Sequence, residues 1–265
     1  MLPKLIDTGT FFLPTYGVLV ATAFLVAIWV TTRLARRDGL DAQKVTDLAL
    51  YCAAGGMLGA KLFMFLFDWR KYLSGEYRLF SIDTLMAAGV FQGGLIVAVL
   101  VAIWFMRSNG LPGLRTSDVF APGLAIGHGI GRLGCFAAGC CWGDKCDLPW
   151  AVTFRNPQAT ELTGVPLGVP LHPTQLYESF AELAIFGVLW LLIHKPHREG
   201  SVLGTYMVLY STVRFLVEFV RNHEQSLIMG LSLTQWISLG TLMAGLWLIL
   251  RPGAVKVPSP PATAV

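Results

Sequence analysis

The chain has 265 residues, of which 54% are hydrophobic and only 14% are charged, and its formal net charge is +4. Soluble domains carry roughly 25% charged residues, so this composition excludes an ordinary soluble domain and indicates a membrane protein. The positive charge does not indicate a nucleic-acid-binding protein, because it is spread over loops and forms no basic stripe. Attraction to an anionic inner leaflet explains it.

Seven apolar segments reach the length of about 20 residues that a helix needs to cross a bilayer. They cover residues 12–32, 47–67, 86–106, 117–139, 174–193, 201–220 and 231–250. We therefore predict an all-α membrane protein, a single polytopic domain over residues 1–251 with about seven transmembrane helices. The fourth segment is the weakest of the seven, because it is rich in glycine and contains His128 and Arg132. The first is too long for a cleaved signal peptide.

The distribution of Lys and Arg predicts an external N-terminus and a cytoplasmic C-terminus. With this orientation the inner loops hold ten of these residues, the outer segments seven and the spans three (Lys61, Arg132 and Arg214), which accounts for all twenty. The proline-containing segment of about 142–171 then forms a small extracytoplasmic cap. Residues 252–265, with three prolines after Val257, are predicted to be a disordered cytoplasmic tail.

The first and third spans each contain a short polar motif. Tyr16-Gly17 opens the first span, and Phe91-Gln-Gly-Gly94 lies in the third. Alone, Tyr16 is typical of an aromatic residue at the membrane interface. Gln92 alone is typical of a buried amide, so the roles of both depend on what they join.

Arg132 is the most informative residue of the fourth span. A guanidinium group near hydrocarbon costs several kcal/mol, so such a residue is by default a functional-site hypothesis with a partner to be found. The surrounding run from Ile126 to Gly143 is rich in glycine, which lets a backbone or a ligand come close. We expect an anion to bind here.

Four of the five cysteines follow Arg132 in a C-x4-CC-x4-C pattern, namely Cys135, Cys140, Cys141 and Cys146. An outward location favours a disulfide, with Cys146 paired to Cys140 or Cys141. A thiolate-bound metal such as zinc is an alternative, although the usual C-x2-C spacing is missing. A catalytic or acyl-carrying thiol beside Arg132 and simple packing are the other interpretations. Cys52 is expected to be a small buried residue.

The fifth span begins with His172-Pro-Thr-Gln-Leu-Tyr-Glu178. Gln175, Glu178 and Glu182 recur at intervals of three and four, which places a polar face on an otherwise hydrophobic helix. We interpret His172, Gln175, Tyr177 and Glu178 together as part of a site. For Glu182 we favour an interhelical hydrogen bond.

In the sixth span, Tyr210, Arg214, Glu218 and Arg221 recur at intervals of four, four and three, which places them on one helix face. Arg214 and Glu218 can pair with each other while Arg221 reaches the outer interface. The alternative is a shared site with Arg132, because two arginines in one cavity need more anion than one glutamate supplies. A phosphodiester headgroup suits them, since guanidinium groups bind phosphate oxygens bidentately.

The chain resembles the bacterial prolipoprotein diacylglyceryl transferase family. The similar pieces occur in family order from the first span to the seventh: Tyr16-Gly17, Gln92-Gly-Gly94, Gly131-Arg-Leu-Gly134, Trp142-Gly143, His172-Pro-Thr-Gln-Leu-Tyr-Glu178, Tyr210, Arg214-Phe-Leu-Val-Glu218 and Gly230-Leu-Ser-Leu-Thr-Gln-Trp236. The resemblance implies seven helices in the bacterial inner membrane, an external N-terminus and a site that opens toward the outer face.

The resemblance also implies a reaction. The diacylglyceryl group of phosphatidylglycerol is transferred to the lipobox cysteine of a prolipoprotein as a thioether, and glycerol 1-phosphate leaves. Arg132 and Arg214 would stabilise the departing phosphate, with Glu218 orienting Arg214 and with Tyr210 shaping the headgroup pocket. The substrate-binding residues implied are Tyr16, Gln92, Gly93, Gly94, Gly143, His172, Gln175, Tyr177 and Glu178. No metal, ATP or other cofactor is implied, because the lipid itself carries the leaving group.

The departures from the family pattern concern the acceptor. The position of Gln92 is usually histidine in the family, where it is the proposed base for the incoming thiol. The family's Asn-Phe-x-Asn-Gly-Glu is here Cys135-Phe-Ala-Ala-Gly-Cys140. His128, one helical turn before Arg132, is a replacement base, unless it is a structural histidine, and His172 is the other candidate. The alternative functions are a phospholipid-dependent transferase with a different acceptor and a non-enzymatic membrane protein that senses redox state or metal.

Overall fold

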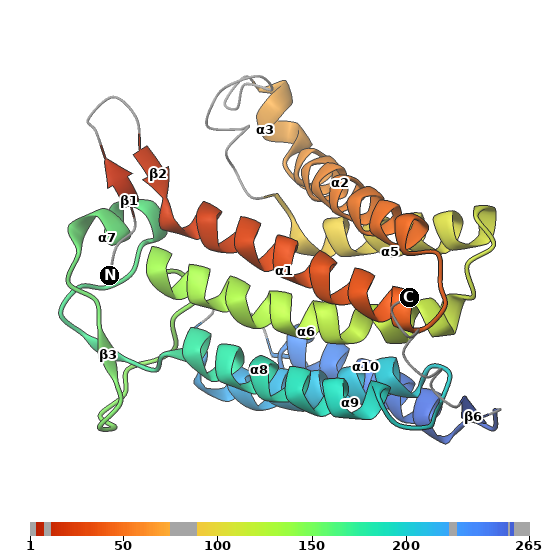
Figure 1. The fold of residues 1–265 in the computed structure, drawn as a ribbon. Coiled ribbons are helices and arrows are strands. Elements are labelled where there is room, and N and C mark those ends of the chain that lie inside the picture. Colours follow the sequence, from red (N-terminus) through yellow and green to blue (C-terminus); the bar gives the residue numbers. More distant parts are fainter. Residues whose placement is uncertain (1–3, 8–11, 75–88, 223–226, 254, 257–265) are drawn as a thin grey trace. The chain divides into compact units, whose positions relative to one another are not determined.

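The computed structural model describes residues 4–7, 12–74, 89–222, 227–253 and 255–256 (Figure 1). The chain divides into two compact units. One unit comprises residues 1–38 together with 117–265, and the other comprises residues 39–116.

Six helices in the described part of the chain are long and apolar enough to cross a membrane. They are α1 (Thr15–Arg37), α2 (Ala42–Phe67), α5 (Phe91–Ser108), α8 (Thr174–Ile193), α9 (Ser201–Val217) with the 3-10 turn η1 (Glu218–Val220), and α10 (Leu233–Leu250). They occupy six of the seven predicted spans, and residues 86–88 of the predicted third span lie outside the described residues. The predicted fourth span is α6 (Gly113–Ala138), a helix of 26 residues that is not among these six. Its glycines and charged residues make it less apolar than the others.

The chain is mostly helical, as predicted, and its strands form short antiparallel pairs. These are β1 (Lys4–Asp7) with β2 (Phe12–Pro14), β3 (Val152–Thr153) with β4 (Pro170–Leu171), and β5 (His197–Arg198) with β6 (Val255–Lys256). Strand β6 belongs to the segment predicted as a disordered tail. Residue 254 and residues 257–265 of that segment lie outside the described residues.

Four of the six glycines of α6 (Gly123, Gly127, Gly129 and Gly134) face its neighbours in the larger unit, where α1 and α6 lie side by side (Figure 1). A Cβ atom added at Gly127 would lie 3.0 Å from the Cβ of Ala27, and one at Gly134 would lie 3.3 Å from the ring of Tyr16. On another side of α6, the hydroxyl of Ser179 in α8 donates to the carbonyl of Gly129 at 2.8 Å. Small residues at these positions let the helices approach closely, so much of the glycine content serves helix packing.

A buried carboxylate fixes the start of α9. Gly200 precedes this helix, and no side chain of its own caps it. Asp118 of α6 takes that role, because its two oxygens accept hydrogen bonds from the backbone N–H groups of Gly200 (2.6 Å) and Leu203 (2.8 Å). A carboxylate at a helix N-terminus satisfies orphan donors and interacts favourably with the helix dipole.

The segment predicted as a cap has a small hydrophobic cluster of its own, formed by Phe154, Ala159, Val165 and Leu171. It contains the β3–β4 pair and α7 (Pro157–Thr163), whose N-terminus is capped by Asn156. The hydroxyl of Thr163 donates to the carbonyl of Gly139 at 2.8 Å. The segment therefore holds the chain where it leaves α6, beside the cysteines.

The smaller unit contains α2, α3 (Trp69–Leu73) and α5. Gln92, Gly93 and Gly94 form part of the first turn of α5, and both glycines are buried. A Cβ atom added at Gly94 would lie 2.8 Å from the carbonyl oxygen of Gly56 in α2. The structure therefore gives Gly94 a packing role between α2 and α5.

We predict that Gly94→Ala destabilises the protein by about 1–3 kcal/mol, because the added methyl group meets a backbone carbonyl that cannot rotate away. Gly56→Ala on the facing helix is the matched control, since its Cβ would make only ordinary contacts at 3.7 Å. Thermal unfolding in detergent measures both. A midpoint that falls equally in the two variants would contradict the packing role.

An arginine–carboxylate cluster and a group of thiols

Arg132 finds its partner on another helix. Its guanidinium Nη2 lies 2.5 Å from the Oε2 of Glu178 in α8, and Glu178 is almost completely buried. The Nε atom of Arg132 is also buried, and it has no hydrogen-bond acceptor among the described residues. One edge of this guanidinium is thus held by a carboxylate, while another N–H remains available to an added ligand.

Arg214 and Glu218 form the second ion pair, with 2.6 Å between the Nη1 and Oε2 atoms. The other carboxylate oxygen of Glu218 accepts a hydrogen bond from the hydroxyl of Ser232 at 2.8 Å. Ser232 also caps α10, because its hydroxyl accepts from the backbone N–H of Gln235 while the Gln235 side chain accepts from the backbone N–H of Ser232. The start of α10 is therefore tied to the end of α9.

Arg221 does not lie on the helix face that the intervals of four and three predicted. The helix α9 ends at Val217, and the 3-10 turn leads to an extended backbone at Arg221. There Arg221 forms a β-bridge with Gly143, and its Nη1 lies 3.4 Å from the Oε1 of Glu178. Glu178 is thereby shared between Arg132 and Arg221, whose side chain is 19% exposed.

The segment at Gly143 runs between the residues that precede α8 and those that precede Arg221, and it leaves no room for a side chain at position 143. Its N–H donates to the carbonyl of His172 at 2.9 Å, and the next N–H, that of Asp144, donates to Val220 at 2.9 Å. A Cβ atom at Gly143 would lie 2.7 Å from the Cβ of His172. A side chain larger than hydrogen would therefore displace the segment that carries Arg221.

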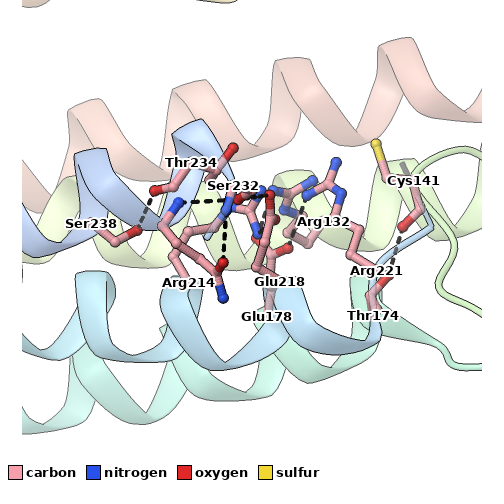
Figure 2. Close-up of polar contacts among 11 residues, drawn as sticks. Arg132, Cys141, Thr174, Glu178, Arg214, Glu218, Arg221, Ser232, Thr234 and Ser238 are labelled. Carbon is pink, nitrogen blue, oxygen red and sulfur yellow. Dashed lines mark hydrogen bonds and ion pairs between the residues drawn. The ribbon is translucent and has the colours of Figure 1, made fainter. Parts of the chain in front are cut away.

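Figure 2 shows the arginine cluster, by which we mean Arg132, Glu178, Arg214, Glu218, Arg221 and Ser232. Three guanidinium groups face two carboxylates, so the cluster carries a formal net charge of +1 when both carboxylates are ionised. A positive charge buried among apolar helices requires compensation. One monoanionic ligand would neutralise the cluster, and the guanidinium geometry suits phosphate oxygens.

His128 and Glu182 form a separate pair beside the cluster. The Nδ1 of His128 lies 2.8 Å from the Oε1 of Glu182, and the side chain of His128 is 28% exposed. The ring of Tyr210 packs edge-on against the imidazole, with 5.2 Å between the centroids.

His172 belongs to a chain of hydrogen bonds at the mouth of α8. Its Nδ1 lies 3.2 Å from the hydroxyl of Tyr177, which also accepts a hydrogen bond from the indole N–H of Trp150 at 2.8 Å. Gln175 is buried and donates to the carbonyl of Cys140 at 2.6 Å. These residues hold the two loops that flank the cluster.

Three of the four clustered cysteines come together where α6 ends. Gly139 adopts a left-handed conformation with φ of +78°, and its N–H bonds to Phe136 at 3.2 Å, while the N–H of Cys140 bonds to Cys135 at 3.0 Å. This pair of hydrogen bonds is a Schellman motif, which folds the chain back over the last helical turn. The Sγ atoms of Cys135, Cys140 and Cys141, which we call the three-thiol cluster, all lie within 4.8 Å of one another.

The three-thiol cluster is electrostatically unequal. Hydrogen bonds from the Cys135 and Cys140 thiols lower the pKa of the Cys141 thiol, and the charges of Arg221 and Arg132 act in the same direction. The hydrogen bonds that stabilise the thiolate of Cys141 raise the pKa of Cys140. All five cysteines are free thiols in the structure, and the Sγ of Cys146 accepts instead from the backbone N–H of Leu148 at 3.4 Å.

The structure thus brings together most of the predicted site residues of the larger unit. Tyr16, which is half-exposed, packs against α6 at Gly134 and interacts electrostatically with Arg132. Gln92, Gly93 and Gly94 belong to the other unit. Sequence reasoning assigned no role to Ser232 or Gln235, although a serine three residues before a glutamine at the start of an apolar span is the signature of a capping box.

The fold and the cluster define a multi-pass helical membrane protein with a buried cationic site. A family model for prolipoprotein diacylglyceryl transferase matches residues 3–251, and the chain belongs to this family. Curated relatives named phosphatidylglycerol–prolipoprotein diacylglyceryl transferase include those of Bordetella avium, 35% identical over 94% of this chain and 93% of its own length, and Methylobacillus flagellatus, 32% identical over 94% and 95%. That of Vibrio campbellii is 32% identical over 94% of this chain and 87% of its own length.

We predict that Ser232→Ala lowers the free energy of unfolding by about 1–3 kcal/mol, because it removes a helix cap and the hydrogen bond to buried Glu218. Ser238→Ala on the same helix is the matched control. Ser238 is also buried, but its hydroxyl only donates back to the carbonyl of Thr234 at 2.9 Å. Thermal unfolding compares the two, and equal midpoints would show that the link from Ser232 to Glu218 contributes nothing.

Proposed function

We propose that this protein transfers the diacylglyceryl group of phosphatidylglycerol to the lipobox cysteine of a prolipoprotein and releases glycerol 1-phosphate. The observation that carries the proposal is the buried arginine cluster, with its net charge of +1 and an unpaired N–H on Arg132. The membership of the chain in the family supports the same reaction. The phosphodiester of the lipid is the monoanion that the cluster lacks.

Arg132 and Arg214 bind the phosphate and stabilise the charge that develops on it as the carbon–oxygen bond breaks. Fixed donors in a water-poor site stabilise such charge more strongly than water does. Glu178 and Glu218 orient the two guanidinium groups, and Ser232 fixes Glu218. Arg221 shares Glu178 and adds a third positive charge.

Tyr16 and Tyr210 shape the headgroup pocket, one from α1 and the other from α9. His172, Gln175, Tyr177 and Gly143 contribute by holding the loops at the mouth of α8 in place. Gln92, Gly93 and Gly94 belong to the smaller unit, and we propose their role in substrate binding on the family resemblance alone.

His128 is the base that accepts the proton of the acceptor thiol. The thiolate is the nucleophile, and a glutamine at position 92 cannot accept a proton at neutral pH. Glu182 accepts a hydrogen bond from one imidazole nitrogen of His128 and thereby leaves the other as the acceptor. Tyr210 fixes the ring plane.

We propose that α6 crosses the membrane as a seventh helix, since its 26 residues exceed the length required. The N-terminus is external, the segment of about 142–171 caps the site on the outer face, and the C-terminal tail is cytoplasmic. The protein lies in the bacterial inner membrane, where phosphatidylglycerol and a prolipoprotein peptide both reach it.

We predict that Arg132→Ala reduces the release of glycerol 1-phosphate from labelled phosphatidylglycerol and a lipobox peptide by at least about 100-fold. Arg132→Lys keeps a charge opposite Glu178 but loses bidentate phosphate binding, so its activity falls less. Arg155→Ala, at an exposed position, is the control that keeps full activity.

Unchanged activity of Arg132→Ala would rule out the proposed donor site. Release of glycerol 1-phosphate without alkylation of the peptide would instead indicate an acceptor other than a prolipoprotein. Rescue of a strain depleted of its own diacylglyceryl transferase provides the same comparison in cells.

We predict that His128→Gln slows transfer to the lipobox peptide by roughly 100-fold, because it removes the proposed acceptor of the thiol proton. His172→Gln is the matched control and keeps more of the activity. Single-turnover rates with labelled phosphatidylglycerol measure both variants. A larger loss in His172→Gln than in His128→Gln would transfer the role of base to His172.

A further inference from the structure

The three-thiol cluster has the composition and spacing of a metal-binding site. The Sγ atoms of Cys135, Cys140 and Cys141 lie within 4.8 Å of one another, and each side chain is half-buried. A zinc–sulfur bond of about 2.3 Å in tetrahedral geometry places the sulfurs about 3.8 Å apart.

The backbone that carries these thiols is fixed on both sides. The Schellman motif at Gly139 folds Cys140 back over Cys135. Buried Thr174 donates to the carbonyl of Cys141 at 2.6 Å, and buried Gln175 donates to the carbonyl of Cys140, also at 2.6 Å. Ligands held in advance in this way lose little conformational freedom when a metal ion binds.

Three thiolates and one divalent ion carry a net charge of −1. Sulfur ligands select soft ions, among them zinc(II) and copper(I).

The number of ligands indicates what such an ion would do. The group contains no fourth His, Cys, Asp or Glu ligand within the part of the chain that the structure describes. Structural zinc sites have four protein ligands, whereas catalytic sites have three and an open position. A three-ligand site next to the proposed phosphate-binding arginines leaves room for a ligand from outside.

We propose that Cys135, Cys140 and Cys141 bind one zinc ion, and that its open position takes the thiol of the acceptor. The second half of this proposal rests on the proposed function. The acceptor thiol would lose its proton on coordination, since a coordinating thiol is deprotonated. Its sulfur then forms the bond to the diacylglyceryl carbon as the bond from that carbon to the phosphate oxygen breaks, and glycerol phosphate leaves with the electron pair.

No oxidant or reductant is needed in this step. The phosphodiester monoanion becomes a phosphate monoester dianion, and the proton of the acceptor thiol is released to water. The metal activates the thiol by stabilising its thiolate, which compensates for a glutamine at the position where the family usually has histidine.

Metal analysis of the reduced protein tests the site itself. We expect about one zinc per chain, and a thiolate-to-metal charge-transfer band when cobalt(II) replaces zinc. Cys141→Ser and Cys140→Ser each reduce the bound metal at least roughly tenfold, whereas Cys52→Ser leaves it unchanged. Absence of bound metal in the wild-type protein after incubation with zinc overturns the proposal, as does a stable disulfide within the cluster that persists in the isolated protein.

Titration of the cobalt(II) form with lipobox peptides tests the open position without any turnover. A peptide containing cysteine shifts the spectrum, and the same peptide with serine in its place does not. No shift with either peptide overturns the binding of the acceptor to the metal. Turnover by a metal-free protein refutes this inference and leaves the proposed function intact, whereas metal binding with no turnover on phosphatidylglycerol refutes the proposed function alone.

Discussion

The burial of three guanidinium groups among apolar helices is the constraint on which the site depends. Glu178 compensates the charge of two guanidinium groups, because its oxygens face Arg132 and Arg221. Glu218 compensates the third, that of Arg214. Removing one partner of a buried pair typically costs 3–5 kcal/mol. The helices α6, α8 and α9 are therefore held together by the same charges that we propose to bind the lipid phosphate.

The sequence was sufficient to predict several features that depend on local spacing. Hydropathy located the helices, and the interval of four predicted the Arg214–Glu218 pair. The Arg132–Glu178 pair joins residues 46 positions apart, and no periodicity connects them. The extended backbone at Arg221 also escaped prediction, because its cause is the distant segment at Gly143. The strand pairs of two residues are too short to leave a recognisable pattern.

The backbone conformation at Gly139 determines which of the clustered cysteines meet, and the residue spacing alone does not. The spacing C-x4-CC left a disulfide, a metal and packing as alternatives. Gly139 and the hydrogen bonds of the Schellman motif place Cys140 and Cys141 against Cys135, and Cys146 is not a member of the group. Two amides and a carboxylate of the family pattern correspond here to the thiols of Cys135 and Cys140 and the methyl group of Ala138, and Cys141 adds a third thiol beside the arginine cluster.

The anchoring of α9 has a mechanical consequence. Asp118 accepts hydrogen bonds from the first turn of α9. At the other end of the helix, Glu218 pairs with Arg214 and accepts a hydrogen bond from Ser232, the cap of α10. Because both of its ends are held, α9 resists sliding along its axis and rotation about it. Arg214 is thereby held at one level along the bundle relative to both α6 and α10, since Asp118 belongs to α6 and Ser232 caps α10.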